Sequence, residues 1–222
     1  MSEASPLAIE PDHIVVAARS LAEGAAWCEA TLGATPVEGG RHATMGTHNR
    51  LLGLGDGVRQ RMYLEIIALD PEAPPPPRAR WFDLDSPALQ AEIAVAPRLV
   101  HWVARCNDID RAIAALRAAG HDPGEALAVE RMTAHGLLRW RIALRDDGRR
   151  LAGGAVPLLI EWGAAHPCDH LPASGVSVTH LALGGVDRGV AERLGVSLAA
   201  AGAPPLSVAL DTPRGRVELV GA

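Results

Sequence analysis

Histidine and glutamate recur at matching places along this chain. His13 and His101 stand at or near the head of short apolar runs, and Glu65 and Glu161 lie inside later apolar runs. Imidazole and carboxylate groups carry acid–base and metal chemistry. A glutamate with apolar neighbours on both sides is costly to bury as an unpaired ion. A single strand histidine is more often a structural residue and a single strand glutamate more often faces solvent, so the functional interpretation depends on the repetition.

The unit that carries these residues occurs about three times, and such a repeat is strong evidence about architecture. Each unit opens with a histidine, continues through a helix that ends at glycine, and closes on the strand with the glutamate. The third unit is shorter, and we expect its His180 and Glu218 to face solvent or to be vestigial. We divide the chain into a first module at 10–70, a proline-rich connector with a short helix at 71–97, a second module at 98–167 and a truncated third unit at 175–222.

Local signals place one helix near the start of each of the first two modules. Ser20 is a suitable N-cap and Gly33 a suitable C-terminal residue for the first helix. Asn107 or Asp108 begins the second helix, and Gly120 ends it. Three β-branched or alternating segments follow each helix, so both modules are predicted to have the order strand, helix, strand, strand, strand.

The prolines of the connector predict its conformation. Four consecutive prolines at 74–77 exclude a helix and indicate a stiff, extended segment. Ser86-Pro87 then resembles an N-cap followed by proline at the first helical position.

Composition limits the classes of function and location. The chain has 222 residues, 48% of them hydrophobic, and a net charge of −5, which gives no basic surface for nucleic acid. Apolar runs are too short for a membrane span, and Met1 to Pro11 has no apolar core of a signal peptide. Three widely spaced cysteines make no disulfide framework. We therefore expect a cytoplasmic protein with no nucleic-acid or membrane partner.

Several motifs in this order resemble the vicinal oxygen chelate superfamily, in particular its branch of glyoxalase-like domains. The βαβββ order occurs twice, and residues 10–167 carry the resemblance. The motifs are Asp12-His13-Ile14-Val15-Val16, Arg41-His42, Gly46-Thr47-His48-Asn49-Arg50, Tyr63-Leu64-Glu65, Val100-His101-Trp102 and Leu159-Ile160-Glu161-Trp162. The resemblance implies an α+β fold in which paired βαβββ modules form an open, cupped sheet of the glyoxalase/bleomycin-resistance/dihydroxybiphenyl-dioxygenase type. Exposed edges of such a sheet favour self-association as a homodimer.

The resemblance also implies a metal site. Its metal positions fall on His13, Glu65, His101 and Glu161. Two imidazoles and two carboxylates suit a divalent ion such as Zn, Ni, Mn or Fe(II), with positions left for water or substrate. The metal would act as a Lewis acid on a carbonyl or a pair of vicinal oxygens and stabilise an enolate or enediolate.

The implied activity is that of a metal-dependent isomerase, lyase or epimerase acting on a small oxo-substrate. Glu161 is the first choice for the base that moves the proton next to the carbonyl, and Glu65 the second. Arg41, His48 and Asn49 flank the cup in the resemblance and are predicted to hold a substrate carboxylate or carbonyl. A turn held by His48 and Asn49 is the competing structural interpretation.

Two other functions remain open at this point. An extradiol-type dioxygenase needs two histidines and one carboxylate on Fe(II), which His13, His101 and Glu161 would supply. A metal-free binding protein would use the same cup for a small molecule, with tryptophans such as Trp102 and Trp162 facing it. Other histidines are assigned outside the site: His42, His121, His135 and His170 to the surface, and His166 to a loop.

Overall fold

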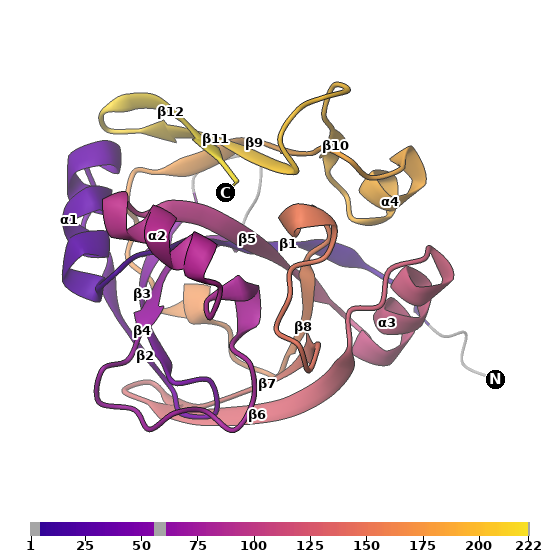
Figure 1. Cartoon of the computed structure of the whole chain (residues 1–222), viewed down its shortest axis with the longest axis horizontal. Helices are drawn as coiled ribbons and strands as arrows, with labels where there is room; N and C mark the ends of the chain where they lie inside the picture. The colour runs from indigo at the N-terminus through magenta and orange to yellow at the C-terminus, as the bar shows by residue number, and fades with distance from the viewer. Residues whose placement is uncertain (1–4, 56–60, 222) are drawn as a thin grey trace.

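The computed structural model describes residues 5–55 and 61–221, and it contains a large, strongly curved sheet with a smaller sheet packed on its outer face (Figure 1). The large sheet has the strand order β2-β3-β4-β1-β5-β8-β7-β6, and the small one β10-β9-β11-β12. The α+β fold class and the curved sheet are as predicted. The strands are β1 (Ile9–Ala17), β2 (Val37–His42), β3 (Thr47–Gly53), β4 (Tyr63–Leu69), β5 (Arg98–Cys106), β6 (Glu125–Thr133), β7 (Gly136–Leu144), β8 (Leu158–Trp162), β9 (Ser177–Leu183), β10 (Ser197–Leu198), β11 (Leu206–Thr212) and β12 (Gly215–Val220).

The helices begin where their capping residues predict. The helices are α1 (Leu21–Leu32), α2 (Pro87–Val95), α3 (Ile109–Ala118) and α4 (Arg188–Arg193), with 3₁₀ turns η1 (Trp81–Asp83), η2 (Ala152–Gly154) and η3 (Pro167–Asp169). The Ser20 hydroxyl accepts a hydrogen bond from the backbone N–H of Glu23, and the Asp108 carboxylate accepts one from that of Arg111. Gly33, at φ 71°, ends α1 in the left-handed conformation that glycine adopts without steric cost.

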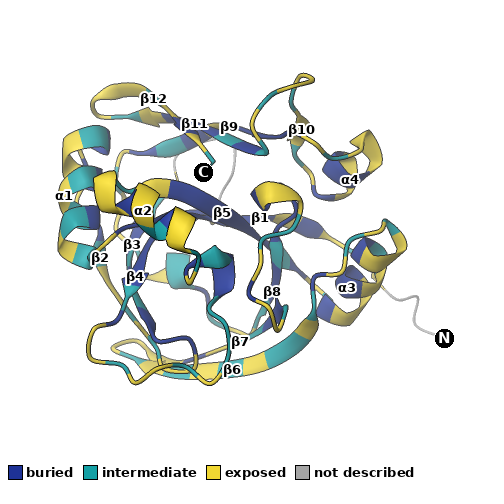
Figure 2. Cartoon of the chain, viewed as in Figure 1, coloured by how far each residue is buried: buried dark blue, intermediate teal, exposed yellow. Residues whose placement is uncertain are grey.

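The two halves of the large sheet meet at β1 and β5, which pair antiparallel. β1 pairs parallel with β4, and β5 pairs parallel with β8, so the strand order is the same when read inward from either edge. Nearly all of β1 and β5 is buried because both of their faces are covered (Figure 2). The concave face carries the site, and the convex face carries most of the core.

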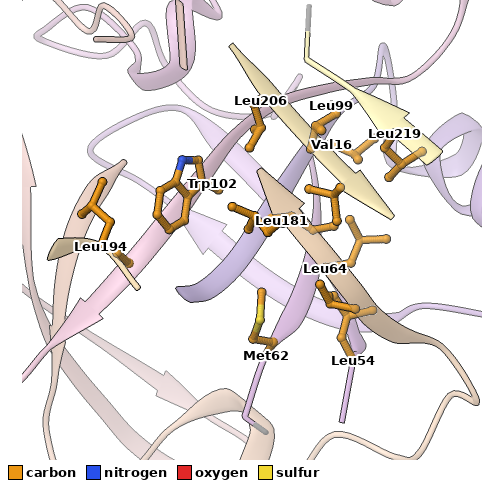
Figure 3. Packing of buried hydrophobic residues seen from close by; sticks show 14 of the residues in the cluster. Val16, Leu54, Met62, Leu64, Leu99, Trp102, Leu181, Leu194, Leu206 and Leu219 are labelled. Atoms are coloured by element: carbon orange, nitrogen blue, oxygen red, sulfur yellow. The ribbon is translucent and has the colours of Figure 1, made fainter. Parts of the chain in front are cut away.

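The C-terminal sheet covers the convex face. Val16 of β1 and Trp102 of β5 share one core cluster with Leu181 of β9 and Leu206 of β11 (Figure 3). In this sheet β11 pairs antiparallel with β9, and β12 lies at the edge, unlike the last strand of either half of the large sheet. His180 is exposed, as is Glu218.

The connector packs into the concave face. Trp81 and Phe82 of η1, followed by Leu89 and Ile93 of α2, form a second core cluster with inward residues of β1, β4, β5, β7 and β8. Phe82 has a φ of 61°, a conformation that costs free energy in a bulky residue and persists only where surrounding contacts hold it. The concave face is therefore partly filled by the protein itself.

Within residues 5–55 and 61–221, no helix is both long and apolar enough to cross a membrane.

Candidate functional site

The site begins at a β-bulge in β1. Pairing with β5 shifts between Pro11 and His13, so Asp12 is the extra residue of the bulge. A bulge re-aims the side chains around it, and such features concentrate near active sites. Here Asp12 is completely buried, and its Oδ1 lies 2.6 Å from Nδ1 of the neighbouring His13.

The Asp12 carboxylate connects β1 to the segment that follows β8. Its Oδ2 accepts a hydrogen bond of 3.0 Å from Trp162 Nε1 and lies 2.9 Å from His166 Nε2. Because His166 Nδ1 accepts the backbone N–H of Cys168, the proton of that ring is on Nε2 and is donated to Asp12. Burial raises the pKa of Asp12, but the hydrogen bonds from His13 and His166 outweigh it and hold the pKa well below its ordinary value. His166, expected to be a loop residue only, thus belongs to the site.

Glu65 of β4 lies beside His13. Parallel pairing places His13 opposite Tyr63 and Val15 opposite Glu65, so the two functional side chains are on adjacent strands and the same face. Since His13 Nδ1 faces Asp12, its Nε2 is directed toward Glu65, with 3.8 Å between Nε2 and Oε2. The other glutamate oxygen, Oε1, accepts a hydrogen bond of 2.6 Å from Asn49 Nδ2.

The side chain of Asn49 is itself fixed by β2. Its Oδ1 accepts the backbone N–H of Gly40 at 2.7 Å, and its Nδ2 is 3.4 Å from His42 Nε2. The second nitrogen of His42 is 3.0 Å from the Thr47 hydroxyl. Burial and then the positive charge of Arg131 lower the pKa of His42 to about 3, so this ring is neutral. The assignment of His42 to the surface was wrong, because its ring lies against Asn49 and edge-on to Trp81 in the lining of the site.

These groups line a small cavity of about 40 Å³ on the concave face. Tyr63 stacks on His13 with ring centroids 4.4 Å apart. The lining residues are His13, His42, Asn49, Leu51, Tyr63, Glu65, Trp81, Phe82, Arg131, Leu138, Trp140, Ile142, Ile160, Trp162 and Pro167. The cavity thus combines one carboxylate, one guanidinium and two imidazoles with a mostly aromatic and aliphatic wall.

His101 is not in this cavity. It lies in a separate space of about 10 Å³ beside Arg150, with its ring 5.2 Å from Phe82. Trp81 and Phe82 line both spaces, so the connector stands between His101 and the pair of His13 and Glu65. Burial, followed by the charge of Arg150, lowers the pKa of His101 to about 3.

Glu161 points away from the concave face, contrary to prediction. Its Oε2 is 3.4 Å from the backbone N–H of Ile109 at the start of α3 and 3.3 Å from Arg141 Nη1. The register explains this. Val15 pairs with Glu65 in the first half, and Val103 pairs with Leu158 in the second, so Leu158 takes the place that corresponds to Glu65. Glu161 is three residues further along β8, and an odd offset on a strand changes the face.

Two of the three residues predicted to hold the substrate also lie outside the cavity. Arg41 is exposed and pairs with Asp70 at 3.1 Å and Glu72 at 2.5 Å. His48 precedes Asn49 on β3, and strand alternation directs it to the opposite face. Of the three residues, only Asn49 lines the cavity that holds Glu65.

The predicted four-ligand metal set does not fit this arrangement. His13 and Glu65 are adjacent, but His101 lies behind Phe82, and Glu161 lies across the sheet. In the described part of the chain, no group of three or more His, Cys, Asp or Glu side chains is placed to hold a metal ion. The triad of an extradiol-type dioxygenase, His13 with His101 and Glu161, does not come together either.

Residues 12–202 match the family described as "Glyoxalase-like domain". The chain belongs to this family. The resemblance to the vicinal oxygen chelate superfamily is confirmed with it. No match to this glyoxalase-like domain was found among curated proteins.

Solved structures similar to this glyoxalase-like domain include a hypothetical protein from Staphylococcus aureus. It is 14% identical, with a TM-score of 0.55, over 97% of this chain and 87% of that one. Methylmalonyl-CoA epimerase from Mycobacterium tuberculosis is 18% identical, with a TM-score of 0.40, over 72% and 90% of the two chains. The Streptomyces coelicolor methylmalonyl-CoA epimerase in complex with 2-nitronate-propionyl-CoA is 19% identical, with a TM-score of 0.44, over 70% and 96%. At these identities the first structure shows a shared fold, and the two epimerases carry no argument about activity.

Besides His42, sequence reasoning missed three residues of the site. Asp12 was read only as part of a motif, although a carboxylate directly before a strand histidine signals a possible partner for the ring. Arg131 directly follows Glu130 on a strand where exposed and half-buried residues mix, and nothing local distinguishes it from its exposed neighbours. His166 was placed outside the site because the chain returns to Asp12 only after 154 residues.

Proposed function

We propose that this glyoxalase-like domain transfers a proton at the carbon next to a carbonyl group in a small oxo-substrate, as an isomerase, lyase or epimerase does, with Glu65 as the base. The observation that supports this most directly is the arrangement of the Glu65 carboxylate. Asn49 holds one of its oxygens at 2.6 Å, and the other is directed toward His13 in the cavity. A general base must be fixed and within reach of the proton that it removes.

His13 is the second proton-handling group in this proposal. Asp12 accepts its Nδ1 proton, so Nε2, the nitrogen that faces Glu65, is the one that exchanges a proton with the carboxylate. Glu65 removes the proton from the substrate carbon, and His13 Nε2 receives it from the Glu65 carboxyl. Return of the proton to another carbon, or to the other face of the same carbon, completes the reaction of an isomerase or epimerase. In a lyase the enolate instead expels a leaving group from the neighbouring carbon, and the leaving group takes the proton from His13.

The negative charge that develops on the substrate oxygen needs a stabilising group. Arg131 lines the same cavity as Glu65 and supplies a fixed positive charge. Preorganised charges in a site that excludes water stabilise a developing oxyanion far more than they would in bulk water. The apolar wall formed by residues such as Ile142 and Ile160 provides that exclusion.

The test is exchange of substrate hydrogen with solvent. Small 2-oxo acids, 2-hydroxy aldehydes and malonyl thioesters are incubated in heavy water with the protein, and loss of the proton signal next to the carbonyl is followed by NMR. We expect Glu65→Gln to reduce exchange by at least about a hundredfold, the usual contribution of a general base. Glu161→Gln is the matched control and is expected to retain full exchange, because its carboxylate lies on the other face of the sheet. Exchange that survives in Glu65→Gln, or is lost in Glu161→Gln, contradicts the assignment of the base.

A metal-free binding protein is the second candidate function. Trp81, Trp140 and Trp162 all line the cavity, and aromatic walls suit the binding of a small organic molecule. Saturable binding of these compounds without any exchange, equal in the wild type and in Glu65→Gln, would favour this function over the enzyme.

A further inference from the structure

The side chain of Arg131 extends from one edge of the curved sheet to the other. It belongs to β6, one edge of the eight-stranded sheet, and it reaches to β2, the other edge. A Cβ atom on Gly40 would lie only 1.9 Å from Arg131 Nη1, so the guanidinium fills the space that a side chain there would occupy. The pairing of β2 with β3 shifts between Glu38 and Arg41, which brings Gly40 toward the guanidinium.

The guanidinium has donors without acceptors. Its Nε and Nη1 are buried and find no hydrogen-bond partner among the described residues. Glu65 attracts it electrostatically, but the Oε1 oxygen of that carboxylate is already held by Asn49. Arg139, on the neighbouring β7, differs in both respects, because it is exposed and paired with Glu130 at 3.1 Å. Burying a guanidinium whose N–H donors have no acceptor costs free energy, and an anion that accepts those hydrogen bonds offsets the cost.

Ligands can reach Arg131 from two sides. It lines the cavity of about 40 Å³ with Glu65, a cavity of about 130 Å³ beside His135 and His170, and one of about 250 Å³ beside Arg41 and Trp81. The central cavity admits only a small head group, and the two outer ones have room for the rest of a molecule. Arg131 therefore lies where a substrate entering between the sheet edges would first meet a charge.

We propose that Arg131 binds a carboxylate adjacent to the reacting carbonyl, with its remaining N–H donors available to the carbonyl oxygen, so that the substrates of this protein are small oxo-carboxylates. A carboxylate accepts two parallel N–H bonds from a guanidinium, which also fixes its orientation. Among the described residues that line the central cavity, Arg131 is the only arginine, and Glu65 already places one negative charge beside it. A monoanionic carboxylate therefore fits better than a dianion, which Leu138 and Trp140 would not solvate. This inference rests on the proposed function for the reaction, but the binding site can be tested separately.

The experiment is a titration followed by tryptophan fluorescence, because three tryptophans line the cavity. The probes are 2-oxobutyrate, its uncharged analogue 2-oxobutanamide, and inorganic phosphate. We expect the wild type to bind 2-oxobutyrate at least about tenfold more tightly than the amide or phosphate, the usual effect of a charged hydrogen bond. Arg131→Gln should abolish this preference, whereas the matched control Arg139→Gln should keep it.

A second variant leaves the arginine in place. In Gly40→Ala the new methyl group displaces the flexible guanidinium, so the preference for the carboxylate should fall here as well. Thermal unfolding of both variants tests for misfolding, and Arg131→Gln should lose little stability, because it removes buried donors that have no hydrogen-bond partner among the described residues.

Three results would overturn the inference: no saturable binding of 2-oxobutyrate by the wild type, equal affinity for acid and amide, or an unchanged preference in Arg131→Gln. The proposed reaction fails separately, when the carboxylate preference is intact but Glu65 is not needed for exchange. Conversely, exchange that depends on Glu65 without a carboxylate preference leaves the reaction and removes the subsite.

Discussion

Asp12 connects three otherwise separate groups of the site. Its carboxylate accepts hydrogen bonds from His13 of β1, Trp162 of β8 and His166 in the turn after β8. The same bonds fix which nitrogen of His13 faces the cavity. One buried carboxylate therefore links β1 to the segment that follows β8. It also determines which nitrogen of His13 faces Glu65.

Asp12→Asn tests this residue. The amide cannot accept all three hydrogen bonds, and its NH₂ group cannot accept the His13 proton, so the ring is free to change tautomer. We expect proton exchange to fall at least about tenfold and the free energy of unfolding to fall by about 1.5–3 kcal/mol, the cost of one buried charged hydrogen bond. NMR exchange and denaturant unfolding measure the two effects, and wild-type values of both would show that Asp12 has no such role.

The pH dependence of the same variant follows from the lowered pKa of Asp12. As pH falls below the ordinary aspartate pKa near 4, the unfolded chain takes up a proton that the native carboxylate does not. The stability that Asp12 contributes is thus complete at neutral pH and is lost in acid. The difference in unfolding free energy between wild type and Asp12→Asn should be largest near neutral pH and smaller at about pH 3.

At the scale of elements, strand register decides which residues meet. Glu65 and Glu161 both lie in apolar strands, yet the pairing of β8 with β5 places Leu158 at the position that matches Glu65. The bulge in β2 acts in the same way, because it brings Gly39 and Gly40 against Asn49 and Arg131.

Gly39→Ala tests the role of β2. A Cβ atom at this position would lie 2.0 Å from Asn49 Oδ1 and 2.8 Å from the carbonyl oxygen of the same residue. The backbone atom cannot easily move away, so we expect a loss of about 1–3 kcal/mol in stability and a lower exchange rate as Asn49 releases Glu65. Gly189→Ala in α4 is the control, since a methyl group there meets no atom within 4 Å. Equal stability and exchange in the two variants would argue against a positioning role for β2.

At the scale of the whole molecule, the C-terminal sheet and the curved sheet share one core. Leu206 of β11 is completely buried in the cluster that contains Val16 and Trp102. The C-terminal sheet therefore supports the convex face of the two strands that carry His13 and His101 on the other side.

Leu206→Ala should consequently destabilise the entire protein. Loss of a fully buried leucine side chain costs about 2–5 kcal/mol, and a shared core predicts one cooperative transition in circular dichroism and in tryptophan fluorescence. Separate transitions for the two probes would show instead that the C-terminal sheet unfolds on its own.

The elements and the family of this protein could be predicted from local sequence signals. Caps such as Ser20 and Asp108 act within one turn, and apolar periodicity reports which segments have a buried face, so both can be read locally. The motifs around His13 and Glu65 led to the glyoxalase-like family, which the match over residues 12–202 confirms.

Which side chains share the site depends on contacts between distant parts of the chain. The bulge at Asp12, the face of Glu161, the separation of His101 by Phe82 and the reach of Arg131 across the sheet all depend on pairing between distant strands. If the pairing shifts by one residue, the side chains that faced one side of the sheet face the other side. When both faces of a strand are buried, both are apolar, so the sequence pattern does not reveal which register forms. For this reason the sequence indicated which residue types could carry the chemistry, but not which of them lie close together.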